Sequence, residues 1–122
     1  LPGMVSNNWG RIINLTGMNA IHGYSGRAPV SVAKHGVWGL TKALAKEFGS
    51  SGITVNAISP GPILGARDSQ AKADQVAGDI KYIPIGRLGA PEEVAVVASM
   101  LASDRGAFVN GQMIQVNGGA AM

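Results

Sequence analysis

The sequence predicts an α/β fold, one βαβαβ half of a Rossmann-type doubly wound parallel sheet. Three short strands are expected at residues 10–16, 53–58 and 111–116, and the first of them is an apolar run without the polar alternation of a half-exposed strand. Such runs are typical of strands buried on both faces of a parallel sheet. Helical patterns at 30–48 and from Pro91 onward separate them. Strands joined by helical crossovers pair in parallel with right-handed connections.

The first strand is bounded by Gly10 and Gly17, and a glycine-rich loop over 17–29 follows it. The helix expected over 30–48 has a broad apolar stripe, and Gly49-Ser50-Ser51-Gly52 supplies its stop signal. The stripe consists of Val30, Ala33, Val37, Trp38, Leu40, Leu44, Ala45 and Phe48.

The second strand is expected to end before Ser59-Pro60-Gly61-Pro62, which we expect to be neither strand nor helix. Residues 66–82 are polar and weakly helical, which indicates a mobile segment, and 83–90 form a connector. Pro91 stands at the first helical position with two glutamates behind it, a good helix start.

Length and composition limit the function. The 122 residues form one small domain, with 46% hydrophobic and 14% charged residues, as in a packed globular chain. The net charge is +3, but the ten Lys and Arg residues form no basic run, which argues against a nucleic-acid partner. No apolar run is long enough to span a bilayer, and the absence of cysteine excludes disulfides and thiolate metal sites. We therefore expect a cytoplasmic protein without a metal site or a membrane partner.

Ligands of open parallel sheets bind beyond the carboxyl ends of the strands. Three segments leave such ends here: 17–29, 59–65 and the tail after Asn117. The segment from Ser59 to Ile63 can present backbone groups to a planar amide, or it can be an ordinary Pro-Gly turn. Lys34 lies near a helix start, where the dipole disfavours a cation. This lysine is either solvated or holds an anion, a hydroxyl or a sugar.

Several motifs in order carry a resemblance to a known family. They are Gly10-Arg11-Ile12-Ile13-Asn14, Lys34, the run from Ile53 to Ile63, Gly86-Arg87-Leu88-Gly89-Ala90-Pro91-Glu92-Glu93-Val94-Ala95, Leu101-Ala102-Ser103-Asp104, Asn110-Gly111-Gln112 and Val116-Asn117-Gly118-Gly119. Over nearly all its length the chain resembles the C-terminal half of a short-chain dehydrogenase/reductase. The resemblance implies hydride transfer between NAD or NADP and a small-molecule alcohol or carbonyl.

The family's Tyr-x-x-x-Lys motif transfers only in part. Lys34 matches the lysine, which binds the nicotinamide ribose and lowers the pKa of the tyrosine. Val30 stands where that tyrosine belongs, and Gly17 stands at the serine position with Thr16 beside it. Both of these chemical groups are therefore absent from their places.

The family's carboxamide-binding loop is matched by Pro60, Gly61 and Ile63, although Gly65 replaces the threonine that often follows. For the missing phenol, Tyr24 or His22 in the 17–29 loop is the candidate proton donor; the alternative is that they only shape the pocket. Thr16 replaces the serine hydroxyl toward substrate and cofactor, or it is a strand residue bonded to the backbone.

Partner and position predictions follow. The family dimerises through this long helix, so we expect a homo-oligomer through 30–48 and the C-terminal strand, with Trp38 in the core or at that contact. His35 is expected to pack beside the helix.

Two functions remain open. The first is an NAD(P)-dependent oxidoreductase whose glycine-rich, pyrophosphate-binding half lies upstream, so that residues 1–122, a partial NAD(P)-binding domain, are inactive alone. The second is a non-catalytic scaffold or subunit, suggested by Val30 and Gly17. A basic binding module has only the pI of about 9.6 in its favour. We also expect the N-terminus to be a cut, which would leave an apolar sheet edge and make the isolated chain poorly soluble or dependent on a partner chain.

Overall fold

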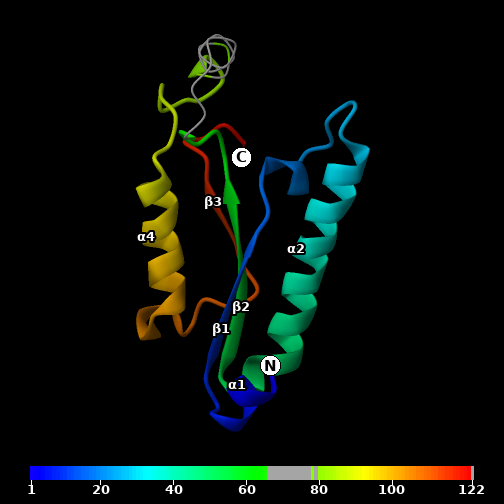
Figure 1. The fold of residues 1–122 in the computed structure, drawn as a ribbon, viewed down its shortest axis with the longest axis vertical. Coiled ribbons are helices and arrows are strands. Elements are labelled where there is room, and N and C mark those ends of the chain that lie inside the picture. Colours follow the sequence, from blue (N-terminus) through cyan, green and yellow to red (C-terminus); the bar gives the residue numbers. More distant parts are fainter. Residues whose placement is uncertain (66–77, 79, 122) are drawn as a thin grey trace.

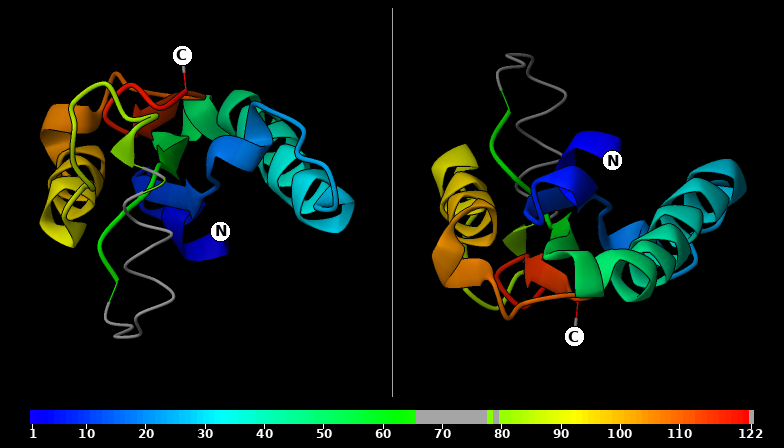
Figure 2. Two further views of the ribbon diagram at one scale, coloured as in Figure 1. Left: turned by 90° about the horizontal axis from the view of Figure 1, so that it is seen from above. Right: turned by 90° about the horizontal axis from the view of Figure 1, so that it is seen from below.

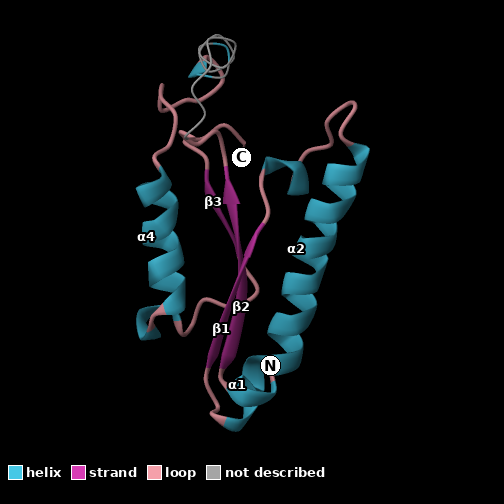
Figure 3. Cartoon of the chain, viewed as in Figure 1, coloured by secondary structure: helices cyan, strands magenta, loops and turns pink. Residues whose placement is uncertain are grey.

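A three-stranded parallel sheet lies between two long helices (Figures 1 and 2). The computed structural model describes residues 1–65, 78 and 80–121. The sheet has the order β1-β2-β3; helix α2 covers one face and α4 the other (Figure 3). The elements are α1 (Pro2–Ser6), β1 (Gly10–Leu15), α2 (Ala28–Phe48), β2 (Ile53–Pro60), α4 (Pro91–Ala102) and β3 (Met113–Val116). The predicted parallel βαβαβ architecture is confirmed.

Strand β2 is the centre of the fold because it pairs with β1 on one side and with β3 on the other. All its residues from 53 to 59 are buried, and these include the polar residues Thr54, Asn56 and Ser59. Ile53 and Val55 form a core cluster with Ala45 of α2. On the α4 side, Leu101 is fully buried.

Helix α2 buries most of the predicted stripe: Ala45 is buried in the core, and Leu44 and Phe48 pack against it. It begins at Ala28, so Pro29 lies in the first turn, where its missing N–H is not needed. Of the predicted stripe, Val30 and Leu40 are 42% and 51% exposed. The buried face also includes Thr41, whose hydroxyl accepts a hydrogen bond from Asn14 Nδ2 (2.9 Å). Hydrophobic periodicity did not indicate this polar contact between the helix and the sheet.

Strand β2 extends to Pro60, so the prediction that Ser59 and Pro60 lie outside the strand is wrong. Pro60 is paired with Val116 in the register, and the next residue, Gly61, donates its N–H to Val116 O (3.0 Å). Since N–H groups alternate between neighbours along a strand, the nitrogen of Pro60 points toward the β1 side. Strand β1 ends at Leu15, so no ladder hydrogen bond is lost there.

Strand β3 is shorter than predicted because Gly111 has φ +67° and lies outside it. Two asparagines hold the segment before the strand against β2. Asn110 accepts from Val55 N–H (2.8 Å) and donates to Ala45 O (3.0 Å). Asn56 donates to Val109 O (2.7 Å) and accepts from the N–H of Gln112 (3.0 Å).

Helix α4 starts at Pro91, as predicted, and Glu93 accepts the N–H of Ala90 (2.7 Å). Short 3₁₀ turns occupy Met18–Ala20, Gly49–Ser51 and Asp104–Gly106. Most of the segment predicted over 66–82 lies outside the described residues. No helix in the described part of the chain is both long enough and apolar enough to cross a bilayer.

Candidate active site

A pocket of about 410 Å³ opens at the carboxyl end of the sheet, where the fold class places ligands. One wall is the loop after β1, and the other is the segment after β2. Its lining residues are Gly17, Met18, Asn19, Tyr24, Arg27, Pro60, Gly61 and Pro62. The structure thus brings together three of the predicted site residues, Tyr24, Pro60 and Gly61.

Gly17 has a backbone conformation that only glycine adopts readily, φ +142° and ψ 172°. A Cβ built there would have Pro60 O at 3.9 Å as its nearest neighbour, so the obstacle to a side chain is backbone strain and not lack of space. The absence of the family's serine at this position is therefore coupled to the path of the loop.

The C-terminal tail packs against the backbone of Gly61. A Cβ on Gly61 would come within 2.6 Å of Asn117 Cβ. Asn117 is itself held, since it donates to Ala121 O (2.8 Å) and accepts from Gly119 N–H (2.9 Å). The segment Pro60–Pro62 consequently offers the pocket a preformed backbone surface.

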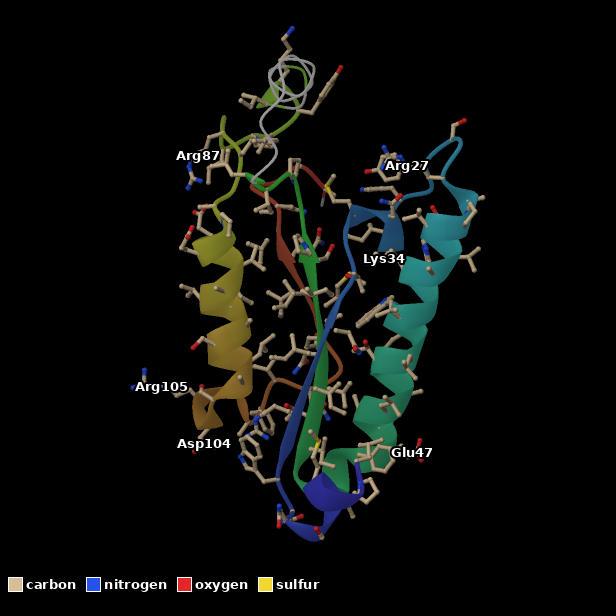
Figure 4. The ribbon with its side chains drawn as sticks, viewed as in Figure 1. Arg27, Lys34, Glu47, Arg87, Asp104 and Arg105 are labelled. Atoms are coloured by element: carbon tan, nitrogen blue, oxygen red, sulfur yellow. The ribbon has the colours of Figure 1, made fainter. Side chains whose placement is uncertain are left out.

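Lys34 is half-buried on α2 and donates from Nζ to Leu15 O (3.1 Å) at the end of β1 (Figure 4). This hydrogen bond holds the ammonium near the carboxyl end of the sheet, although Lys34 is not among the residues that line the pocket. Val30, one turn earlier, is an exposed apolar side chain. His35 is also exposed, and its Nδ1 lies 2.9 Å from Ser31 O, within its own helix.

Thr16 and Ile63 lie apart from the pocket lining. Thr16 is 6% exposed, and its hydroxyl donates to Ile58 O (3.2 Å), so this hydroxyl is bonded within the sheet. Ile63 forms an isolated bridge with Gly89 and lines a smaller cavity of about 80 Å³. Their predicted cofactor contacts stay predictions.

The smaller cavity contains an ion pair at the start of α4. Arg87 donates both Nη atoms to the two carboxylate oxygens of Glu93, at 2.8 and 2.7 Å. These hydrogen bonds, together with the N–H of Ala90, lower the pKa of Glu93 to about 2. The same hydrogen bonds raise the pKa of Arg87. The pair fixes the turn that leads into α4.

Tyr24 and Arg27 come from the loop after β1. Tyr24 is 40% exposed, and its ring meets that of His22 edge to face at 6.4 Å. Sequence reasoning missed Arg27 and Asn19 as pocket residues. A signal existed for Arg27, because it is the only Lys, Arg, Asp or Glu between Arg11 and Lys34. In the described residues no group of three or more His, Cys, Asp or Glu side chains gathers as a metal site would require.

Comparison with known proteins settles the family. Residues 1–121 match the family model described as enoyl-(acyl carrier protein) reductase. The chain belongs to the short-chain dehydrogenase/reductase family. Its curated relatives include an acetoacetyl-CoA reductase of Shinella zoogloeoides, 45% identical over 119 residues that make up 96% of this chain and 49% of that protein. Another is the 3-oxoacyl-[acyl-carrier-protein] reductase FabG of Pseudomonas aeruginosa, 43% identical over all of this chain and 49% of that protein.

Solved structures of this short-chain dehydrogenase/reductase family have the same fold. A putative NAD(P)-dependent gluconate 5-dehydrogenase from Beutenbergia cavernae, with bound NADP, superimposes with a TM-score of 0.89 at 36% identity. The match covers 98% of this chain and 49% of that one. The chain thus spans about half the length of the relatives it matches.

Proposed function

We propose that the full-length protein carrying this chain is an NAD(P)-dependent oxidoreductase that interconverts a small-molecule alcohol and carbonyl. The observation that supports this most directly is the pocket at the carboxyl end of the sheet, between the loop after β1 and Pro60–Pro62. The relatives include two reductases and a putative dehydrogenase with bound NADP, which supports the same chemistry.

The residues present fit the nicotinamide end of the cofactor. The backbone of Pro60–Gly61 has no competing side chain and is held by Asn117, as a surface for a planar carboxamide requires. Lys34 presents three N–H donors, of which one is directed to Leu15 O, and the others suit ribose hydroxyls. When bound, the cofactor supplies or accepts the hydride. Residues 1–122 alone contain no glycine-rich pyrophosphate turn, so we propose that they do not turn over substrate by themselves.

Tyr24 is the proposed proton donor in place of the absent motif tyrosine. Its phenol lines the pocket together with Pro60 and Gly61, so a carbonyl bound there would lie within its reach. The role of Tyr24 is to hold a proton at Oη and pass it to the carbonyl oxygen as the hydride reaches carbon.

The test uses the full-length protein and follows NAD(P)H absorbance against a panel of carbonyl compounds. We expect turnover, and we expect Tyr24→Phe to lower kcat by about 100-fold, at the low end of a general acid's contribution. Tyr82→Phe is the matched control, because Tyr82 is 80% exposed outside the pocket lining. Turnover that survives in Tyr24→Phe would remove Tyr24 from the mechanism, and absence of both turnover and cofactor binding would refute the oxidoreductase proposal.

A non-catalytic member of the family is the second candidate, and Val30 and Gly17, which stand at the tyrosine and serine positions, favour it. In that case the full-length protein binds NAD(P)H without consuming it. The discriminating variant is Val30→Tyr, which restores a phenol one turn before Lys34 at an exposed position. Activity that appears only in Val30→Tyr, and not in Val30→Phe, would assign the wild type to this second class.

We further propose that the protein is a homo-oligomer through α2 and β3. Val32 and Leu40 of α2 are 73% and 51% exposed, which leaves apolar surface on that helix. Light scattering of the full-length protein tests this proposal. The cytoplasmic location stays a prediction.

A further inference from the structure

We propose that Arg27 binds a carboxylate on the substrate, so that the pocket takes a short oxo acid and the corresponding hydroxy acid. This inference rests on the proposed function for the chemistry, but it concerns binding and adds no reaction step. It names the class of molecule that the pocket at the carboxyl end of the sheet selects.

The lining of the pocket carries a positive charge. Of the eight residues that line the pocket, Arg27 is the one with a charged side chain. The ion pairs of the described residues join Arg11 to Asp104 and Arg87 to Glu93, so neither uses Arg27. A guanidinium remains charged at every physiological pH. Within the described part of the chain, the pocket is therefore a cavity of net positive charge without a carboxylate of its own.

The position of Arg27 relative to Lys34 also supports a substrate contact. Arg27 is the residue that precedes α2, and Figure 4 shows its side chain at the carboxyl end of the sheet, on the same side of the helix as Lys34. Lys34 is directed at Leu15 O and is not part of the lining. The two cations are thus divided, with Lys34 available to the cofactor and Arg27 facing the space left for the substrate.

The chemistry of the guanidinium group favours a carboxylate as its partner. Its planar fork donates two parallel N–H bonds to a carboxylate or a phosphate. A carboxylate carries one negative charge, which a single arginine balances, whereas a phosphate close to dianionic would need a second cation that the described lining does not provide. Tyr24 adds a hydroxyl donor on the same wall.

The size of the pocket limits the length of the acid. A volume of about 410 Å³ is near the lower end of small-molecule pockets, which run from roughly 300 to 1,000 Å³. The nicotinamide proposed at Pro60–Gly61 would share this space, so the pocket suits a short acid with its carbonyl one to three bonds from the carboxylate.

The test compares each of two oxo acids with its own methyl ester, which is nearly the same size but uncharged. The probes are 2-oxobutanoate and 4-oxopentanoate with their methyl esters, offered to the full-length protein with NAD(P)H. We expect KM to be lower for the acids, and we expect Arg27→Gln to raise the acid KM by about 10- to 100-fold, the value of a charge-assisted hydrogen bond. The ester KM should change less than about threefold, within the range of an exposed contact.

Two further variants separate the site from general electrostatics. Arg27→Lys keeps the charge but loses the fork, so it should recover only part of the acid preference. Arg105→Gln removes one positive charge at the other end of the molecule, where Figure 4 shows Arg105 beyond α4, and should leave every KM unchanged. Equal effects of Arg27→Gln on acids and esters, or no effect on either, would overturn the proposal.

Binding measured without turnover keeps this proposal separable from the oxidoreductase proposal. Ligand-observed NMR with the two acids and with inorganic phosphate reports binding even if no carbonyl is reduced. Binding of the acids that is lost in Arg27→Gln supports the carboxylate site whatever the outcome for hydride transfer. The carboxylate site is refuted if only phosphate binds, or if neither acid binds at millimolar concentration.

Discussion

Gly17→Ser should destabilise the protein although it restores the side chain that the family carries at this position. Gly17 has φ +142° and ψ 172°, a region that is essentially restricted to glycine. A residue with a Cβ held there costs about 1–3 kcal/mol. Replacement of glycine also lowers the entropy of the unfolded chain, which returns about 0.4–1 kcal/mol.

Gly23→Ser in the same loop is the matched control. Gly23 is exposed, it does not have a left-handed φ, and a Cβ built on it meets nothing within 4 Å. The control therefore includes the unfolded-state effect without the strain, and the difference between the two variants isolates the strain of about 1–3 kcal/mol. Urea unfolding of the full-length protein measures both. Equal stabilities within about 0.5 kcal/mol, the usual spread of surface substitutions, would show that Gly17 relaxes freely and refute the reasoning.

Two further predictions concern the α4 side of the sheet. Leu101→Ala should lower the free energy of unfolding by about 2–5 kcal/mol, because Leu101 is fully buried. Val96→Ala, at a 68% exposed position, should change it by no more than about 0.5 kcal/mol. Urea unfolding measures both variants, and equal losses of stability would contradict the packing of Leu101. The pKa of Glu93 is lowered from 4.5 to about 2 by Arg87, so its contribution to stability is present above pH 4.5 and is lost as pH falls toward 2. Melting temperatures between pH 5 and 2 should therefore fall less steeply in Glu93→Gln than in the wild type or in Glu92→Gln, and identical slopes would exclude the ion pair as the cause.

The strands and the start of α4 were predictable because their signals are local. A short apolar run bounded by glycines indicates a strand in a parallel sheet, and β1 has one between Gly10 and Gly17. Pro91 followed by two glutamates defines a helix start without any tertiary contact. The parallel order then follows from the alternation of strands and helices.

Hydrophobicity predicted only part of the buried face of α2, because the helix also packs polar groups against the sheet. Thr41 is fully buried and bonded to Asn14, and Lys34 is half-buried and bonded to Leu15 O, while Val30 faces solvent. Each polar partner lies far away in the sequence, so no local pattern could identify it. Pro60 was misassigned for a related reason: the cost of a proline in a strand depends on which neighbour its nitrogen faces, and this is known only from the register.

The candidate site was half visible in the sequence. The residues proposed to hold the cofactor, Lys34 and Pro60–Gly61, match a motif and lie at the carboxyl end of the sheet. The residues at the substrate end were not visible, because Arg27 and Asn19 belong to no motif and only the path of the loop brings them to the pocket.

The two departures from the family pattern, at Val30 and Gly17, differ in how strongly the structure constrains them. Val30 is exposed, so packing does not prevent a tyrosine there, and its identity is a matter of chemistry alone. Gly17 belongs to the loop that carries Tyr24 and Arg27 into the pocket. A serine at position 17 would destabilise this loop path by about 1–3 kcal/mol. The loop that begins at Gly17 lacks the serine and brings Tyr24 and Arg27 to the pocket. Tyr24→Phe and Val30→Tyr therefore separate an active enzyme from a non-catalytic member of the family, whereas Arg27→Gln tests the proposed carboxylate site in either case.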